Sequence, residues 1–179
     1  MIKNNFPLIV IDNFFSNIDY LLPYLKKIPL YNQSEFNEKF KDHQTWPGYR
    51  SEDLTVSERP LTMLIKKTIE DLKLPMPKQY GIRAFLHLRL SSHESEDWIH
   101  KDNEDNCFKT CIVYLSETNF NSGTNFYLHK NKDTLFADIK FINNYACMFN
   151  AGAFHRSGLN FGSNIDNGRL TLNLFFYDL

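Results

Sequence analysis

Hydrophobic residues recur with two different periods along the chain, and the change falls near residue 75. Before that point, two apolar sets have helical spacing: Ile18, Leu21, Leu22, Leu25 and Ile28, then Leu61, Leu64, Ile65, Ile69 and Leu72. Ser16 and Ser57 precede these sets and are expected to cap the two helices. Pro23 must kink or restart the first helix, because proline lacks the amide proton. Each helix would offer one apolar stripe to a flat partner.

After residue 80, the apolar residues fall in short runs separated by polar turns, which is typical of β-strands. The expected strands are residues 82–90, 97–102, 108–115, 124–128, 145–150 and Arg169–Tyr177. Strands that follow helices predict a mainly β fold, a sandwich or barrel with the helices packed on one outer face.

The last expected strand alternates between apolar and polar side chains. One side carries Leu170, Leu172, Leu174 and Phe176, and the other carries Arg169, Thr171 and Asn173. The apolar side would face the helices. Taken alone, this strand favours water for the polar side, with a wet cavity inside a jelly roll as the alternative.

The length of 179 residues predicts one domain over residues 1–179, with a helical support region at 1–75 and a β core at 80–179.

A net charge of -1 argues against nonspecific binding to nucleic acid, so no nucleic-acid partner is expected. The three cysteines are too few for a disulfide framework. No apolar stretch has the length of a membrane span. We therefore expect a cytoplasmic protein without membrane contact, in the host cytoplasm if the protein is viral.

The residues with the strongest chemical signal are His100, Asp102 and His155. Two residues apart on one expected strand, His100 and Asp102 project from the same face. His155 follows another β run that ends in small residues, which allow a close approach to a crowded centre. Two imidazoles and one carboxylate on one face of an octahedral metal ion leave three positions open. This donor set is typical of non-haem Fe(II) oxygenases.

Arg169 begins the last expected strand, where its planar guanidinium can bind a carboxylate through two parallel hydrogen bonds. Thr171 lies on the same face and could add a hydroxyl contact. The loop that contains Trp46, Tyr49 and Arg50 could line the mouth of the barrel and touch substrate, although a packed turn between helices is an equal interpretation.

The order of motifs resembles the 2-oxoglutarate- and Fe(II)-dependent oxygenases, in particular the small prolyl-4-hydroxylase-like branch with phage and bacterial members. The resemblance runs from about residue 82 to the C-terminus. Its motifs are His100-x-Asp102, the run 110–115, Gly123-Thr124-x-Phe126-Tyr127, His155 and Arg169-Leu170-Thr171.

The resemblance implies a double-stranded β-helix, the cupin-like jelly roll, with helices packed on one sheet. It implies that His100, Asp102 and His155 hold Fe(II), that Arg169 binds the distal carboxylate of 2-oxoglutarate, and that Tyr114 bonds to that same carboxylate. The implied activity is a dioxygenase reaction with O2, in which a substrate C–H bond is hydroxylated and succinate and CO2 are released.

The sequence departs from the prolyl hydroxylases in two places. The gap between His155 and Arg169 is longer than is common there, and residues 88–91 lack a tyrosine that prolyl hydroxylases often carry. The resemblance therefore does not extend to proline as substrate. Arg169 is the last arginine, whereas nucleic-acid demethylases of the superfamily carry a second one soon after. The expected substrate is a peptidyl side chain or a small molecule.

The remaining histidines, His43, His87, His93 and His129, lack a partner at ligand spacing and are expected to be structural or exposed. Residues 129–132 are expected to form a solvated turn. Two other classes of protein remain open. One is a cupin-type jelly roll that binds metal for non-oxidative chemistry. The other is a catalytically silent jelly roll with a binding or structural role.

Overall fold

The structure of the chain is a computed structural model, and it describes residues 8–41, 46–93, 98–102, 106–130 and 132–179. Within these ranges, the elements in chain order are β1 (Ile9–Ile11), α1 (Ile18–Leu25), β2 (Tyr31–Asn32), α2 (Gln33–Phe40), β3 (Tyr49–Arg50), α3 (Leu54–Ser57), α4 (Arg59–Asp71), β4 (Gly81–Arg89), β5 (Cys107–Tyr114), β6 (Asn119–His129), β7 (Lys132–Phe141), β8 (Ala146–Asn150), β9 (Phe154–Ser157) and β10 (Arg169–Tyr177). None of these helices is long and apolar enough to cross a membrane.

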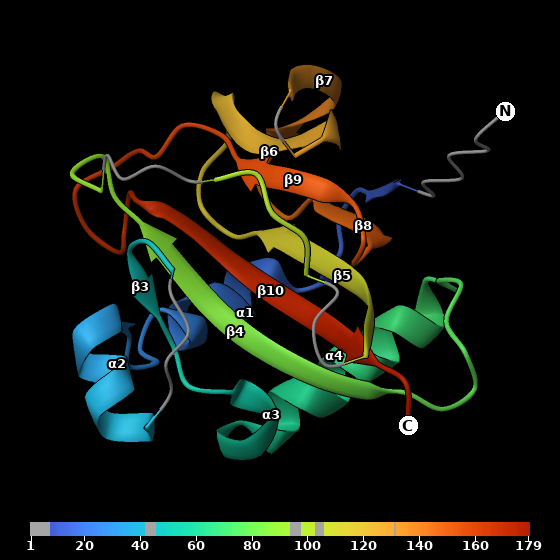
Figure 1. Ribbon diagram of the computed structural model, residues 1–179. Helices are drawn as coiled ribbons and strands as arrows, with labels where there is room; N and C mark the ends of the chain where they lie inside the picture. Colours follow the sequence, from blue (N-terminus) through green and yellow to red (C-terminus); the bar gives the residue numbers. More distant parts are fainter. Residues whose placement is uncertain (1–7, 42–45, 94–97, 103–105, 131) are drawn as a thin grey trace, which may run out of the picture.

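The strands form two antiparallel sheets. The large sheet has the order β1-β8-β5-β10-β4-β3-β2, and the small sheet has the order β7-β6-β9. In Figure 1, β10 lies between β4 and β5, and β9 lies beside β6 in the small sheet. This is the expected jelly roll, because strands far apart in sequence become neighbours in both sheets.

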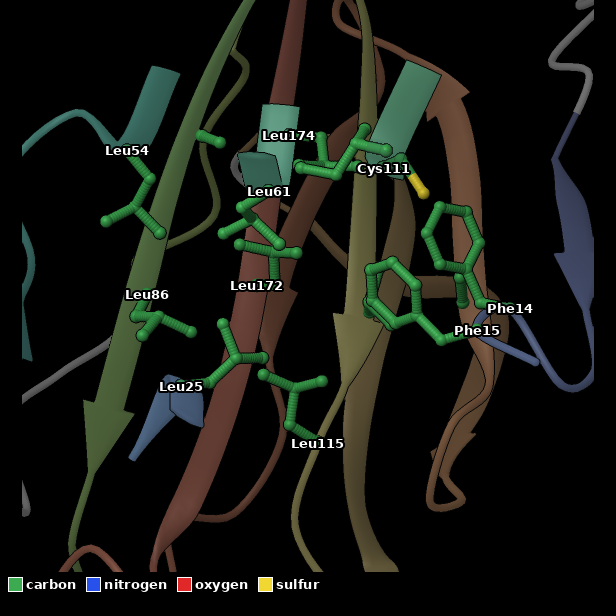
Figure 2. Close-up of a cluster of buried hydrophobic side chains, with 14 of the residues drawn as sticks. Phe14, Phe15, Leu25, Leu54, Leu61, Leu86, Cys111, Leu115, Leu172 and Leu174 are labelled. Carbon is green, nitrogen blue, oxygen red and sulfur yellow. The ribbon is translucent and has the colours of Figure 1, made fainter. Parts of the chain in front are cut away.

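The helices cover one face of the large sheet, as the apolar stripes predict. Side chains of α1 and α4, among them Leu25, Leu61 and Ile65, share one buried cluster with Leu172 and Leu174 of β10. Figure 2 shows this packing, with Leu86 of β4 and Leu115 beside the β10 leucines. The prediction that the apolar side of the last strand faces the helices is confirmed.

The polar side of β10 does not face water, and the expectation from that strand alone was wrong. Arg169 is 3% exposed and Thr171 is 1% exposed. Both line a cavity between the two sheets, together with Asn173. Alternation along one strand shows that its faces differ, but it cannot show that a second sheet, formed by residues between 119 and 157, encloses the polar face.

The helix boundaries differ from those expected. Helix α1 starts after Asn17, not Ser16, and its N-cap makes no side-chain hydrogen bond. Ser57 ends α3 instead of capping α4, which starts with Arg59 and has Pro60 in its first turn. Proline fits there because the first amides of a helix have no partner within the helix.

Helix α2 was not expected. It has a reciprocal cap, in which the Asn32 side chain accepts from the Glu35 amide and the Glu35 carboxylate accepts from the Asn32 amide, both at 3.0 Å. Phe36 is the buried residue of this helix, and its ring lies 4.7 Å from that of Trp46. Its two apolar residues, Phe36 and Phe40, span a single turn, which is too short to establish a helical period.

The strand predictions also need correction. Residues 97–102 do not form a strand in the described part: His100 makes an isolated bridge with His155, and Asp97 lies outside the described residues. Strands β1, β2, β3, β7 and β9 were not predicted; all but β7 have four residues or fewer, too few to show a period. The expected turn at 129–132 joins β6 to β7, and Asn131 within it is not described.

The helix-covered cluster should dominate the free energy of unfolding. We expect Leu172→Ala to destabilise the protein by about 2–5 kcal/mol, because truncating a fully buried leucine leaves a cavity. Met63→Ala, on the exposed face of α4, is the control and should cost under about 1 kcal/mol. Urea denaturation followed by circular dichroism measures both. Equal small losses would contradict this assignment of the core.

Candidate metal centre and its cavity

The three predicted metal ligands come together between the sheets. His155 lies on β9, and His100 and Asp102 lie on the segment that runs beside it. The backbone fixes their register: the His100 amide donates to the His155 carbonyl at 2.9 Å, and the His155 amide donates back at 3.0 Å. The Asp102 amide donates to the carbonyl of Ala151 at 2.8 Å. These three bonds fix the backbone positions from which the three side chains project.

The spacing of the donor atoms fits one metal ion. The Asp102 carboxylate lies 3.6 Å from Nε2 of His100 and 3.4 Å from Nε2 of His155, and the three candidate ligand atoms lie within 4.8 Å of one another. Two ligands at right angles, each about 2.1 Å from an ion, are about 3 Å apart. The two separations from the carboxylate are within about 0.6 Å of this value, and all three donor atoms face one point. The residues present therefore fit a divalent transition metal.

Each histidine presents its Nε2 atom to this centre, because its other nitrogen is already bonded. Nδ1 of His100 lies 2.9 Å from the carbonyl oxygen of Trp98, and Nδ1 of His155 lies 3.1 Å from that of Ala153. A carbonyl oxygen can only accept, so both Nδ1 atoms carry the proton and both Nε2 atoms keep a lone pair. A backbone acceptor behind a ligating imidazole orients the ring and makes it a better ligand.

The carboxylate is oriented in the same manner. The Thr110 hydroxyl, on β5, donates to Oδ2 of Asp102 at 3.0 Å. The His155 ring packs against Phe149, with a centroid distance of 4.7 Å. An oriented carboxylate beside a ring packed in an apolar wall gives a site that is ordered before a metal binds.

The centre opens onto a cavity of about 440 Å³ between the sheets. Its described lining consists of Trp46, Pro47, Arg50, Arg83, Phe85, His87, Arg89, Trp98, His100, Lys101, Asp102, Ile112, Thr124, His155, Ser157, Arg169, Thr171, Asn173, Phe175 and Tyr177. The three metal ligands, Arg169 and Thr171 therefore share one cavity, as the sequence predicts. Trp46 and Arg50 also line it, and their contact with substrate stays a prediction.

Arg169 and Thr171 present polar groups to this cavity. Nη2 of Arg169 donates to the Gly123 carbonyl at 2.9 Å, and the guanidinium carbon lies 5.5 Å from the centre of the Phe141 ring. The Thr171 hydroxyl is buried and has no hydrogen-bond partner among the described residues. Because an unpaired buried hydroxyl costs free energy, this atom marks a position that a polar ligand can satisfy.

Tyr49 and Tyr114 do not line the cavity in the described structure. Neighbouring residues on a strand face opposite sides, so Tyr49 faces away from the Arg50 side; it packs against the hydrophobic cluster, with its ring 5.2 Å from that of His93. Tyr49 therefore does not lie at the cavity with Trp46 and Arg50, contrary to the predicted placement of this loop. The Tyr114 hydroxyl donates to Thr124 Oγ1 at 2.8 Å, and burial raises the pKa of this tyrosine well above its ordinary value. Thr124, not Tyr114, reaches the cavity, and direct contact of Tyr114 with a cosubstrate stays a prediction.

Sequence reasoning missed the contribution of β4. Its residues Arg83, Phe85, His87 and Arg89 line the cavity, while Ile82, Ala84, Leu86 and Leu88 pack towards the helices. The signal was present, since residues 82–90 alternate in the same way as β10. His87 in particular faces the cavity, although the sequence analysis expected it to be structural or exposed.

No protein-family model and no curated protein sequence matches the chain. Solved structures do match. A prolyl-4-hydroxylase from Pseudomonas putida has a TM-score of 0.56 and 13% identity over 96% of this chain and 92% of that chain. HygX from Streptomyces hygroscopicus, with nickel and 2-oxoglutarate bound, has a TM-score of 0.64 and 11% identity over 95% and 81%. The α-ketoglutarate-dependent epimerase SnoN, from nogalamycin biosynthesis, has a TM-score of 0.60 and 12% identity over 96% and 77%.

These comparisons show the fold. The chain has the jelly-roll fold of the 2-oxoglutarate- and Fe(II)-dependent oxygenases, the prolyl-4-hydroxylases among them. The His100, Asp102 and His155 cluster is the one group of potential metal ligands found among the described residues. The resemblance read from the sequence is thus confirmed for the fold.

The Thr110 hydroxyl should contribute to metal affinity. We expect Thr110→Val, which keeps the shape of the side chain, to weaken Ni(II) binding about 10-fold or more, because Asp102 loses the bond that orients it. Thr62→Val, on α4 and far from the cavity lining, is the control and should bind as the wild type does. Isothermal titration calorimetry measures both. Unchanged affinity in Thr110→Val would show that the bond does not orient the ligand.

Proposed function

We propose that the protein is a non-haem Fe(II)- and 2-oxoglutarate-dependent dioxygenase that hydroxylates a C–H bond of a peptidyl side chain or small molecule, with succinate and CO2 as co-products. One observation carries the proposal. A two-histidine, one-carboxylate centre and the buried guanidinium of Arg169 line the same cavity. When bound, iron and 2-oxoglutarate supply the oxidising power for attack on an unactivated C–H bond.

The protein side chains hold and orient the reactants. Nε2 of His100, Nε2 of His155 and the Asp102 carboxylate would hold the metal at the wall of the cavity, and such a donor set would leave coordination positions for other ligands. Arg169 binds the distal carboxylate of the cosubstrate through charge-assisted hydrogen bonds. The unpaired Thr171 hydroxyl, on the same face of β10, donates a further bond to it.

The substrate would enter beside Trp46 and Arg50. The Arg50 guanidinium lies 3.7 Å from the centre of the Phe85 ring and 4.8 Å from that of Trp46, so the cation is stacked in place. This arrangement presents a rigid, partly aromatic wall to the substrate. The overall charge of -1 supports a peptidyl or small-molecule substrate rather than a nucleic acid.

The alternative is a jelly roll with non-oxidative metal chemistry or with no catalytic activity. Such a protein has no need of a buried arginine in the cavity that holds its metal ligands. Arg169 is 3% exposed and lines the cavity that the three metal ligands share, where its planar guanidinium can bind a carboxylate. The position of Arg169 therefore favours a cosubstrate with a carboxylate. Epimerisation, the reaction of SnoN, differs from hydroxylation in its product, which retains the mass of the substrate.

The reaction itself tests the proposal. We expect wild-type protein with Fe(II), O2 and 2-oxoglutarate labelled in its C1 carboxylate to release labelled CO2 slowly even without the primary substrate. Asp102→Ala should lose this release by about 100-fold or more, because it removes a metal ligand. Asp138→Ala removes a carboxylate on β7 outside the cavity and should match the wild type. Release that is independent of Fe(II), or equal in Asp102→Ala, would contradict the proposal.

A further inference from the structure

Two arginines lie directly opposite each other at one end of the cavity. Arg89 is the last residue of β4 and Arg169 is the first residue of β10, and the two are partners in the register of these strands. Both line the cavity, and both are buried, with 7% and 3% of their surface exposed. Directly opposed residues of antiparallel strands have Cβ atoms about 5 Å apart. The two cations are therefore neighbours.

Both side chains span the cavity to the same point of the small sheet. Nη1 of Arg89 donates to the Ser157 hydroxyl, and Nη2 of Arg169 donates to the Gly123 carbonyl at 2.9 Å. Gly158, the neighbour of Ser157, donates its amide to that same Gly123 carbonyl at 2.9 Å. The two guanidinium groups thus end beside adjacent backbone positions.

Packing holds Arg89 in this orientation. Gly48 has a φ of +82°, and a Cβ atom there would lie 2.5 Å from the Leu88 carbonyl oxygen and 3.2 Å from Cγ of Arg89. The loop before β3 can therefore lie directly on the stem of Arg89 only because residue 48 is glycine. A cation held in this way loses little side-chain entropy when it binds a ligand.

We infer that Arg89 is a second cosubstrate-binding residue, and that Arg89 and Arg169 together form one site for the distal carboxylate of a 2-oxo dicarboxylic acid. The inference rests on the proposed function and deepens it. A carboxylate offers about four lone-pair positions on two oxygens, enough for two guanidinium groups. Like charges placed directly opposite each other repel, and an anion between them relieves that repulsion. The site therefore selects a dicarboxylate over a monocarboxylate.

The test compares two ligands that differ in the distal carboxylate. Ni(II)-loaded protein is titrated with 2-oxoglutarate and with pyruvate, which has the metal-chelating 2-oxo acid group but no distal carboxylate. We expect Arg89→Met to bind 2-oxoglutarate about 10- to 100-fold more weakly than the wild type, through the loss of charge-assisted hydrogen bonds. Its affinity for pyruvate should stay within about twofold, since pyruvate does not reach this end of the cavity.

Arg59→Met is the control. It makes the same substitution at an exposed arginine, at the start of α4 and outside the cavity lining. It should bind both ligands as the wild type does. Arg89→Lys keeps the charge and the stem but not the planar fork, so it should fold and bind 2-oxoglutarate with an affinity between those of the wild type and Arg89→Met.

The outcomes separate this inference from the proposed function. If the wild type binds 2-oxoglutarate and the folded Arg89 variants bind it equally well, the inference is wrong and the proposed function stands. If both ligands are weakened equally in Arg89→Met and Arg89→Lys, Arg89 has a structural role, which also overturns the inference. If the wild type binds no 2-oxoglutarate, the proposed function fails and the inference fails with it.

Discussion

The antiparallel pairing of β10 with β4 and β5 is the constraint on which the rest of the structure depends. It places nine residues of β10 in register with β4 and fixes which side chains face each way. The apolar residues of β10 enter the cluster under α1 and α4, and the polar residues enter the cavity. Hydrophobic burial on one face thereby stabilises a costly arrangement of buried polar groups on the other.

The metal centre depends on a second, smaller constraint. Backbone hydrogen bonds join His100 to His155 and Asp102 to Ala151, so ligands 53 residues apart (155 minus 102) meet with their orientation already set. Each imidazole is also oriented by a backbone carbonyl oxygen, and the carboxylate is oriented by the Thr110 hydroxyl. Such preorganisation moves the cost of orienting the ligands from metal binding to folding.

The sequence predicted the parts of this molecule that have a clear period or a motif with few alternatives. The alternation in β10 and the order of the motifs from His100 to Arg169 were enough to predict the fold and the residues that meet in the cavity. Non-local contacts were out of reach: one strand cannot show that a second sheet encloses its polar face. The position of Arg89 opposite Arg169 follows from the register of β4 and β10, which the sequence does not show. Likewise, the sequence does not show that Arg50 faces the cavity and Tyr49 the hydrophobic cluster. Helix α2 has only two apolar residues, Phe36 and Phe40, one turn apart, so its apolar pattern is too short to identify a helix.

His100, Asp102 and His155 are proposed to hold Fe(II), to which 2-oxoglutarate would bind. The most direct test is the visible spectrum of the protein with Fe(II) and 2-oxoglutarate in the absence of oxygen. The account predicts a metal-to-ligand charge-transfer band that appears only when both are present and that is absent from a folded His155→Ala variant. A folded, iron-loaded wild-type protein without this band would contradict the account.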